Sequence, residues 1–184
     1  MSTQSLEPGR SAEFAIFMQT YQDMVFSTAA RLLADQAQAE DVAQAVFLKA
    51  FERFDDLRAN PSVPGWLKTV AINMSLNHLT RYRKRWHFFT DWRAADADEF
   101  AEPEFEVPDT LLDDLLAEER SGRIERALDR LPAHQRVPLV LFHFDELPYQ
   151  DIARQLHVSV GKIKTDIFRG RATLAKLLLE EGGT

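Results

Sequence analysis

Residues 149–178 read YQDIARQLHVSVGKIKTDIFRGRATLAKLL, and this stretch decides the fold. Pro148 suits a first helical turn, and apolar residues then recur at the spacing of one helical face: Ile152, Ala153 and Leu156. A short turn leads to Ser159, whose hydroxyl can cap the next helix. His157 takes the turn position where glycine is usual, and histidine tolerates a left-handed backbone better than most residues. The stretch therefore predicts a helix-turn-helix.

The second helix of this motif has two contrasting faces. Its buried stripe is predicted to contain Val160, Ile163, Ile167, Gly170 and Leu174. On the opposite face are Lys162, Thr165 and Arg169, and on its flank Lys164 and Arg171. Lys162 and the helix N-terminus suit a phosphate, whereas Thr165 and Arg169 can reach base edges in a major groove. We interpret this face as DNA-reading, although Asp166 places a negative charge beside it. An ordinary helical hairpin with a solvated basic face is the alternative.

Helical periodicity continues upstream of this motif. A first long helix is predicted to bury Phe14, Phe17, Met18, Tyr21, Val25, Ala29 and Leu32. Asp35, followed three residues later by Gln38, resembles a capping box. The helix after it is predicted to bury Val42, Val46, Phe47, Ala50, Phe51 and Phe54. RANPSVPG, residues 58–65, predicts a loop, and a third helix is expected from Trp66 to about Trp86.

The remaining apolar segments also have helical spacing. A helix containing Ile124, Leu128 and Leu131 is expected to stop at Pro132, a second spans Val137 to Phe144, and two shorter helices follow. Neither β-type alternation nor an Asn-Gly hairpin signal occurs, so the predicted fold class is all-α.

Charge separates the chain into parts. The net charge is −7, yet residues 91–120 hold twelve acidic side chains against two arginines. The flanking parts are slightly basic, at +1 for residues 1–90 and +2 for residues 121–184. We therefore predict two small helical domains, residues 10–90 and 119–180, joined by an acidic flexible linker at residues 91–118.

Other features exclude whole classes of protein. The chain has no cysteine, which excludes disulfides, thiolate zinc sites and cysteine nucleophiles and suits a reducing cytoplasm. No export signal or stretch of about 20 apolar residues is present, so we expect a cytoplasmic protein. Scattered histidines raise a metal or acid–base enzyme as an alternative: His78, His87, His134, His143 and His157. They form no ligand pair such as HExxH, and we predict no catalytic site, no metal and no cofactor.

The end of the third predicted helix suggests a second nucleic-acid surface. Asn73, Asn77, Thr80 and Lys84 share one polar stripe between apolar flanks. The basic run after it contains Arg81, Arg83, Lys84 and Arg85, interleaved with Tyr82 and Trp86. Cations can hold phosphates and aromatic rings can stack on unpaired bases, as in a single-strand platform. The alternative is that these are ordinary surface residues favoured by the helix dipole.

The order of these parts resembles the extracytoplasmic-function group of bacterial sigma factors. The resemblance rests on AEDVAQAVFLKAFERF (39–54), PGWLKTVAINMSLNHL (64–79), RYRKR (81–85), the acidic linker, and residues 131–174 with the helix-turn-helix. It extends from about Phe14 to Leu178. It implies an alternative sigma factor that binds core RNA polymerase and directs promoter-specific transcription initiation, without an enzymatic site of its own.

The resemblance also implies roles for particular residues. Those implied in core polymerase binding are Asp41, Val42, Gln44, Phe47 and Lys49, with core packing as the alternative for Val42 and Phe47. Those implied in minus-ten DNA binding are Asn73, Asn77, His78, Arg81, Arg83, Lys84 and Arg85. Those implied in minus-thirty-five DNA binding are Ser159, Lys162, Lys164, Thr165, Arg169 and Arg171. The loop from Arg58 to Pro64 resembles one that captures a flipped promoter base.

The partners implied are macromolecules, with no small-molecule substrate. They are the β′ clamp helices and β flap of core RNA polymerase, promoter DNA, and an anti-sigma factor, often membrane-anchored. Two rival functions use the same motif. A conventional helix-turn-helix regulator would bind an operator without polymerase, and a sigma mimic would bind an anti-sigma factor without initiating transcription.

Overall fold

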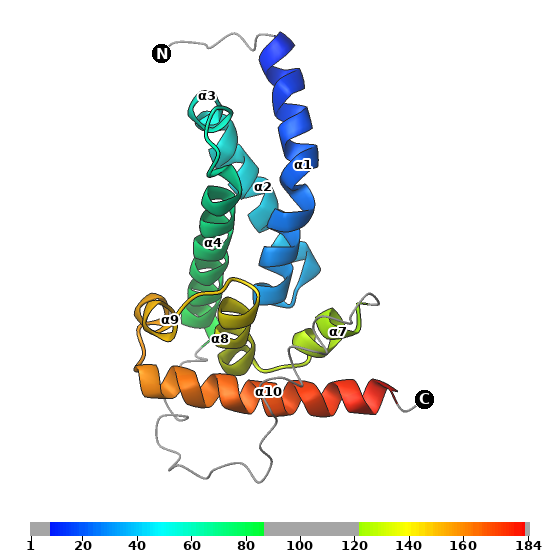
Figure 1. Ribbon diagram of the computed structural model, residues 1–184, viewed down its shortest axis with the longest axis vertical. Helices are drawn as coiled ribbons and strands as arrows, with labels where there is room; N and C mark the ends of the chain where they lie inside the picture. Colours follow the sequence, from blue (N-terminus) through cyan, green and yellow to red (C-terminus); the bar gives the residue numbers. More distant parts are fainter. Residues whose placement is uncertain (1–7, 87–121, 183–184) are drawn as a thin grey trace. The chain divides into compact units, whose positions relative to one another are not determined.

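A computed structural model describes residues 8–86 and 122–182, which fall into two compact units, Met1–Thr80 and Arg81–Thr184. Every regular element among the described residues is a helix, which confirms the all-α prediction (Figure 1). The predicted linker, residues 91–118, lies outside the described residues, and the predicted domain bounds stay predictions.

The first unit begins with two long helices that pack against each other. These are α1 (Pro8–Leu33) and α2 (Gln36–Glu52). Asp35 caps α2: its carboxylate accepts hydrogen bonds from the Gln38 amide at 3.0 Å and from the Gln38 side chain at 2.8 Å. The predicted cap is therefore confirmed, although the Gln38 side chain bonds to the Asp35 carboxylate and not to its backbone.

Two further helices complete this unit, and all contribute to one core. The short α3 (Phe54–Leu57) leads to the long α4 (Val63–Trp86). The buried core residues are Phe14, Val25, Ala29, Leu33, Ala39, Val42, Val46, Phe47, Ala50, Phe54, Leu57, Val63, Leu67 and Ala71. The Phe14 ring packs edge-on against Phe51 and Phe54, with ring centres 4.9 and 5.1 Å apart. Aromatic contacts of this kind join α1 to the end of α2 and to α3.

The second unit is built around one long helix. α10 (Val160–Gly182) packs against three shorter helices, α7 (Arg123–Asp129), α8 (Ala133–His143) and α9 (Tyr149–Leu156). Its predicted stripe is buried at Ile163, Ile167, Gly170 and Leu174, while Val160 is half-buried. A Cβ at Gly170 would lie 3.2 Å from the Gln135 carbonyl oxygen. Gly170 therefore lies where α10 approaches α8 closely.

The helix bounds differ from the sequence predictions in several places. α4 begins at Val63 and not at Trp66, because Pro64 and Gly65 fit in a first turn, where a proline amide is not needed. α2 and α3 separate at Arg53, which sequence periodicity did not detect. α10 has 23 residues, so the expectation of two short final helices is right only for α9.

Two further findings concern the surface of these helices. Met18 was predicted to be buried but is 36% exposed, because it lies at the edge of the α1 stripe. Of the helices described, none is long and apolar enough to cross a membrane.

Candidate nucleic-acid and protein interfaces

The helix-turn-helix has the turn that the sequence predicts. His157 ends α9 in the left-handed region, with φ 57° and ψ 44°. Its amide and the amide of Val158 both donate to the Ala153 carbonyl. Ser159 then accepts a hydrogen bond from the Lys162 amide at 3.2 Å, which caps α10. The predicted motif and both of its turn residues are confirmed.

The predicted DNA-reading face of α10 is only partly exposed. Lys164 is exposed, and Thr165, Arg169 and Arg171 are half-buried. Lys162, however, retains only 8% exposure. The expectation that Lys162 projects from this face with Thr165 and Arg169 is therefore wrong.

Lys162 instead forms a buried ion pair with Asp166 one turn later. Its Nζ lies 3.2 Å from Oδ2 of Asp166 and donates to Oδ1 at 3.3 Å. Asp166 is only 2% exposed, and this burial raises its pKa above the usual 3.8, while the Lys162 ammonium opposes that shift. Asp166, which was expected to place a negative charge beside the DNA-reading face, is therefore buried inside the second unit, where it neutralises Lys162.

Two other cations of α10 lie against aromatic rings of neighbouring helices. Phe142 of α8 and Tyr149 of α9 stack with ring centres 4.7 Å apart. The Lys164 ammonium is 5.9 Å from the centre of the Tyr149 ring, and the Arg171 guanidinium is 5.6 Å from that of Phe142. Arg171 also donates to His143 at 3.0 Å. These contacts hold both cations in place.

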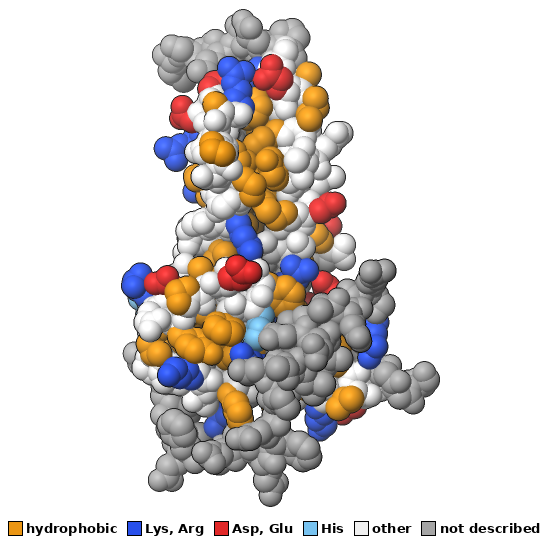
Figure 2. Space-filling view, in the orientation of Figure 1, with side chains coloured by type: hydrophobic (Ala, Val, Ile, Leu, Met, Phe, Trp, Pro, Cys, Tyr) orange, Lys and Arg blue, Asp and Glu red, His pale blue; other side chains and the backbone are white. Residues whose placement is uncertain are grey.

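Figure 2 shows hydrophobic side chains gathered over α8 and α9, with basic side chains at the edge of the patch. The sequence prediction missed Phe142 and Tyr149. The signal that could have found them is an aromatic residue near each end of the α8–α9 connection.

The polar stripe of α4 is exposed where it is described. Asn73, Asn77 and Thr80 all face solvent, and the Thr80 hydroxyl donates to the Leu76 carbonyl at 2.9 Å. His78 is half-buried and lies beside the stripe. Four predicted minus-ten residues lie in the last turns of α4, and their side chains are outside the described residues: Arg81, Arg83, Lys84 and Arg85.

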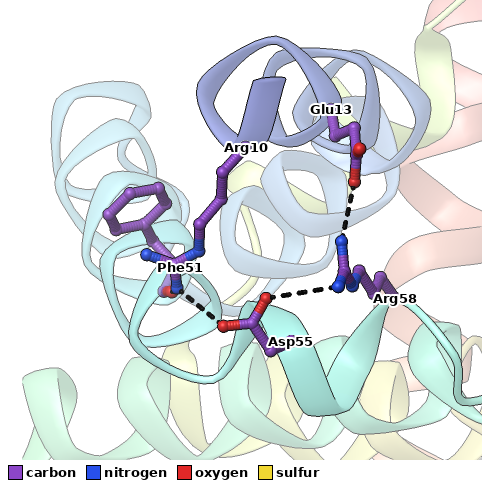
Figure 3. Close-up of polar contacts among 5 residues, drawn as sticks. All are labelled: Arg10, Glu13, Phe51, Asp55 and Arg58. Carbon is purple, nitrogen blue, oxygen red and sulfur yellow. Dashed lines mark hydrogen bonds and ion pairs between the residues drawn. The ribbon is translucent and has the colours of Figure 1, made fainter. Parts of the chain in front are cut away.

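A polar network holds the loop between α3 and α4 (Figure 3). Arg58, the first residue of the predicted base-capturing loop, pairs with Glu13 of α1 at 3.1 Å and with Asp55 of α3 at 3.8 Å. Arg10 pairs with the same Asp55 at 3.4 Å and donates to the Phe51 carbonyl at 3.2 Å. The loop is thus attached to the N-terminal end of α1.

The polymerase-binding residues predicted on α2 divide into two groups. Asp41, Gln44 and Lys49 are exposed, whereas Val42 and Phe47 are 5% and 6% exposed and belong to the core. The core-packing alternative for Val42 and Phe47 is therefore right. Among the exposed residues lies Leu48, at 68% exposure, which the sequence prediction missed. Helical spacing places Leu48 one turn after Gln44 and two turns after Asp41, on the same side of α2.

The described residues contain no group of three or more His, Cys, Asp or Glu side chains placed to hold a metal ion. A helix-turn-helix in one unit and an exposed asparagine stripe in the other define a class: the all-helical proteins that bind nucleic acid through helix faces.

Comparisons with known proteins identify the family. Residues 17–85 match the model of sigma-70 region 2, and residues 121–174 match that of sigma-70 region 4. The RNA polymerase sigma-H factor of Pseudomonas aeruginosa is 30% identical over 177 residues, covering 94% of this chain and 90% of its own length. The ECF RNA polymerase sigma factor SigW of Bacillus subtilis is 29% identical, with 94% and 92% covered.

A solved structure agrees in fold. The sigma factor RpoE of Bartonella quintana, in complex with the anti-sigma factor NepR, is 22% identical with a TM-score of 0.51, covering 90% of this chain and 96% of that one. The chain belongs to the extracytoplasmic-function group of RNA polymerase sigma factors. It is an alternative sigma factor, and its family consists of transcription factors.

Proposed function

We propose that the first unit binds core RNA polymerase and the minus-ten element while the second unit binds the minus-thirty-five element. The observation that carries this proposal is that each unit has its own polar helix face outside its core: the asparagine stripe of α4 and the Lys164 side of α10. Two separate surfaces of this kind suit a promoter with two recognition elements. The polymerase would bind both units at once.

The exposed face of α2 is the proposed contact with the β′ clamp helices. It consists of Asp41, Gln44, Leu48 and Lys49. An apolar side chain that is 68% exposed among polar neighbours suits an interface core with a polar rim. Val42 and Phe47 support this face from behind, because they pack in the core of the first unit.

The α4 stripe and the loop after Arg58 are the proposed minus-ten surface. Asn73 and Asn77 offer both donors and acceptors to base edges, and His78, Arg81, Arg83, Lys84 and Arg85 stay proposed contacts beside them. Asn60 accepts a hydrogen bond from the Ser62 amide at 2.8 Å, which shapes the loop proposed to hold a flipped base.

The proposed minus-thirty-five surface is narrower than the sequence suggests. It contains Ser159, Lys164, Thr165, Arg169 and Arg171. Because Lys164 and Arg171 are held against Tyr149 and Phe142, less side-chain entropy is lost when they contact phosphates. Lys162 is not part of this surface, because its ammonium is buried against Asp166.

Each part of the chain carries only a small net positive charge, +1 for residues 1–90 and +2 for residues 121–184, so we propose that core polymerase joins two weak contacts through effective concentration. The β flap is the proposed site for the second unit, and the cytoplasm is the proposed compartment because the polymerase works there. We also propose control by an anti-sigma factor, since a sigma factor of similar fold was solved with one. The membrane anchor expected for such a partner stays a prediction.

The test starts with the purified chain and sigma-free core polymerase. Complex formation is measured by size exclusion, and transcripts made on fragmented genomic DNA are sequenced. We expect a stable complex and transcription start sites that share a two-part upstream sequence motif. A chain that shifts duplex DNA alone but neither binds core nor starts transcripts is a conventional regulator. A chain that binds an anti-sigma factor but does not start transcripts is a sigma mimic.

A further inference from the structure

The buried pair between Lys162 and Asp166 occupies the first two turns of the recognition helix. A separation of four residues places both side chains on one side of α10. The two side chains are 6% and 2% exposed, and the ammonium approaches both carboxylate oxygens, at 3.2 and 3.3 Å. This is the same turn whose amides are capped by Ser159, next to the proposed DNA contacts.

Lys162 is the cation paired with Asp166, and it contributes most of the charge effects that favour the ionised carboxyl group. His134 of α8 and Arg169 of α10 favour the ionised form less. If Lys162 left this site, a buried carboxylate would lose its closest cation, which is strongly unfavourable. A phosphate on DNA can attract Lys162 only by overcoming that loss.

We propose that Asp166 withholds Lys162 from DNA and so sets the strength of DNA binding by the second unit. The minus-thirty-five element is then contacted by Lys164, Thr165, Arg169 and Arg171, with one phosphate contact fewer than the sequence of α10 would allow. Asp166 thereby weakens DNA binding by the second unit. This inference rests on the proposed function of α10.

The key variant is Asp166→Asn, which removes the negative charge and keeps the side-chain shape. The ammonium is then no longer held by a carboxylate, and its flexible stem lets it reach a nearby phosphate. One added phosphate contact steepens the slope of log affinity against log salt by about 0.9, which amounts to roughly eightfold tighter binding at 0.1 M salt.

The probe is the complex of the full chain with core polymerase, binding a promoter fragment recovered from the transcript mapping. Dissociation constants are measured over a salt series for Asp166→Asn, Lys162→Gln and the double variant. Asp151→Asn is the matched control, because Asp151 is also in the second unit and pairs with Arg154 at 3.1 Å, but its side chain is 42% exposed. It reports the effect of removing any one negative charge.

The expected pattern is specific. Asp166→Asn tightens binding and steepens the salt slope beyond the Asp151→Asn control, and adding Lys162→Gln cancels that excess. Lys162→Gln alone lowers promoter affinity by no more than the Asp151→Asn control raises it. A larger loss of affinity in Lys162→Gln, or an Asp166→Asn gain that equals the control, overturns the proposal.

A second variant covers the case in which a single substitution prevents folding. Lys162→Met combined with Asp166→Leu replaces the buried pair by apolar side chains, which buried sites of this kind often tolerate. This variant has the same net charge as the wild type, so we expect it to bind the promoter as tightly as the wild type does. Weaker binding would mean that Lys162 contacts DNA in the native protein. The wild-type chain is tested for core binding and transcription before any variant is measured. If it fails that test, the proposed function is wrong, and the result says nothing about Asp166.

Discussion

Leu48 gives the sharpest test of the polymerase-binding face. Fully burying a leucine side chain stabilises by about 1.5–3 kcal/mol. Leu48 is 68% exposed in the free protein, so an interface that covers it gains about two-thirds of that value, roughly 1–2 kcal/mol. Leu48→Ala should lose most of this gain, which weakens core binding by about five- to thirtyfold. Folding should be almost unaffected, because the side chain contributes little to the core of the first unit.

The assay is a titration of labelled chain with core polymerase, followed by fluorescence anisotropy, with thermal unfolding measured in parallel. Ile16→Ala is the matched control, since Ile16 is 65% exposed in the same unit but lies on α1 and not on the proposed face of α2. It should bind core as the wild type does. If Leu48→Ala binds core with unchanged affinity, Leu48 is not in the interface and the assignment of this face of α2 is refuted.

Three further predictions concern stability. Ser159→Ala removes the cap of α10 and should lower the free energy of unfolding by about 1 kcal/mol, measured by urea titration of the full chain. Phe54→Ala removes a ring that is 2% exposed and packs against Phe14. It should lower the free energy of unfolding by about 3–5 kcal/mol and lower the thermal midpoint with it. A loss of less than about 1 kcal/mol in the free energy of unfolding would contradict the described core. Because burial raises the pKa of Asp166, the folded state binds its proton more tightly than the unfolded state does. This tighter proton binding stabilises the folded wild type below pH 3.8, and the stabilisation is lost as pH rises through the raised pKa. Asparagine does not titrate, so the free energy of unfolding of Asp166→Asn, measured by urea titration, should rise relative to that of the wild type as pH increases above 3.8. A wild-type advantage that grows with pH would show that the ion pair outweighs burial.

Much of the fold follows from local patterns in the sequence. Helical spacing identifies the buried stripe of α10, and side-chain chemistry identifies the caps at Asp35 and Ser159. The left-handed turn at His157 follows from the length of the connection between two helices. Such features depend on residues within one or two turns of each other, which is the range over which a sequence pattern carries structural information.

Helical periodicity fails to predict structure where neighbouring helices decide which residues are covered. Met18 satisfies the period of α1, but how far the stripe extends around the helix is set by the helices that cover it. Pro64 and Gly65 predict a loop, yet a first helical turn accepts both residues. Val42 and Phe47 fit a binding face and a core equally well by spacing, and only the packing of α2 in the first unit shows that they are core.

The two informative errors at the candidate sites are opposite in kind. A lysine on a recognition helix was expected to be exposed, and Lys162 is buried because an acid four residues later neutralises it. A leucine on an amphipathic helix belongs by default to the core, and Leu48 is exposed. A buried charge works against folding stability and calls for an explanation, whereas a single exposed leucine is ordinary by itself and is informative here because of its polar neighbours on α2. In this chain the apolar group lies on the proposed polymerase face and the buried charge on the proposed DNA face. Together they favour a factor that binds polymerase first and depends on it for DNA affinity, because the helix that reads DNA is weakened by its own aspartate.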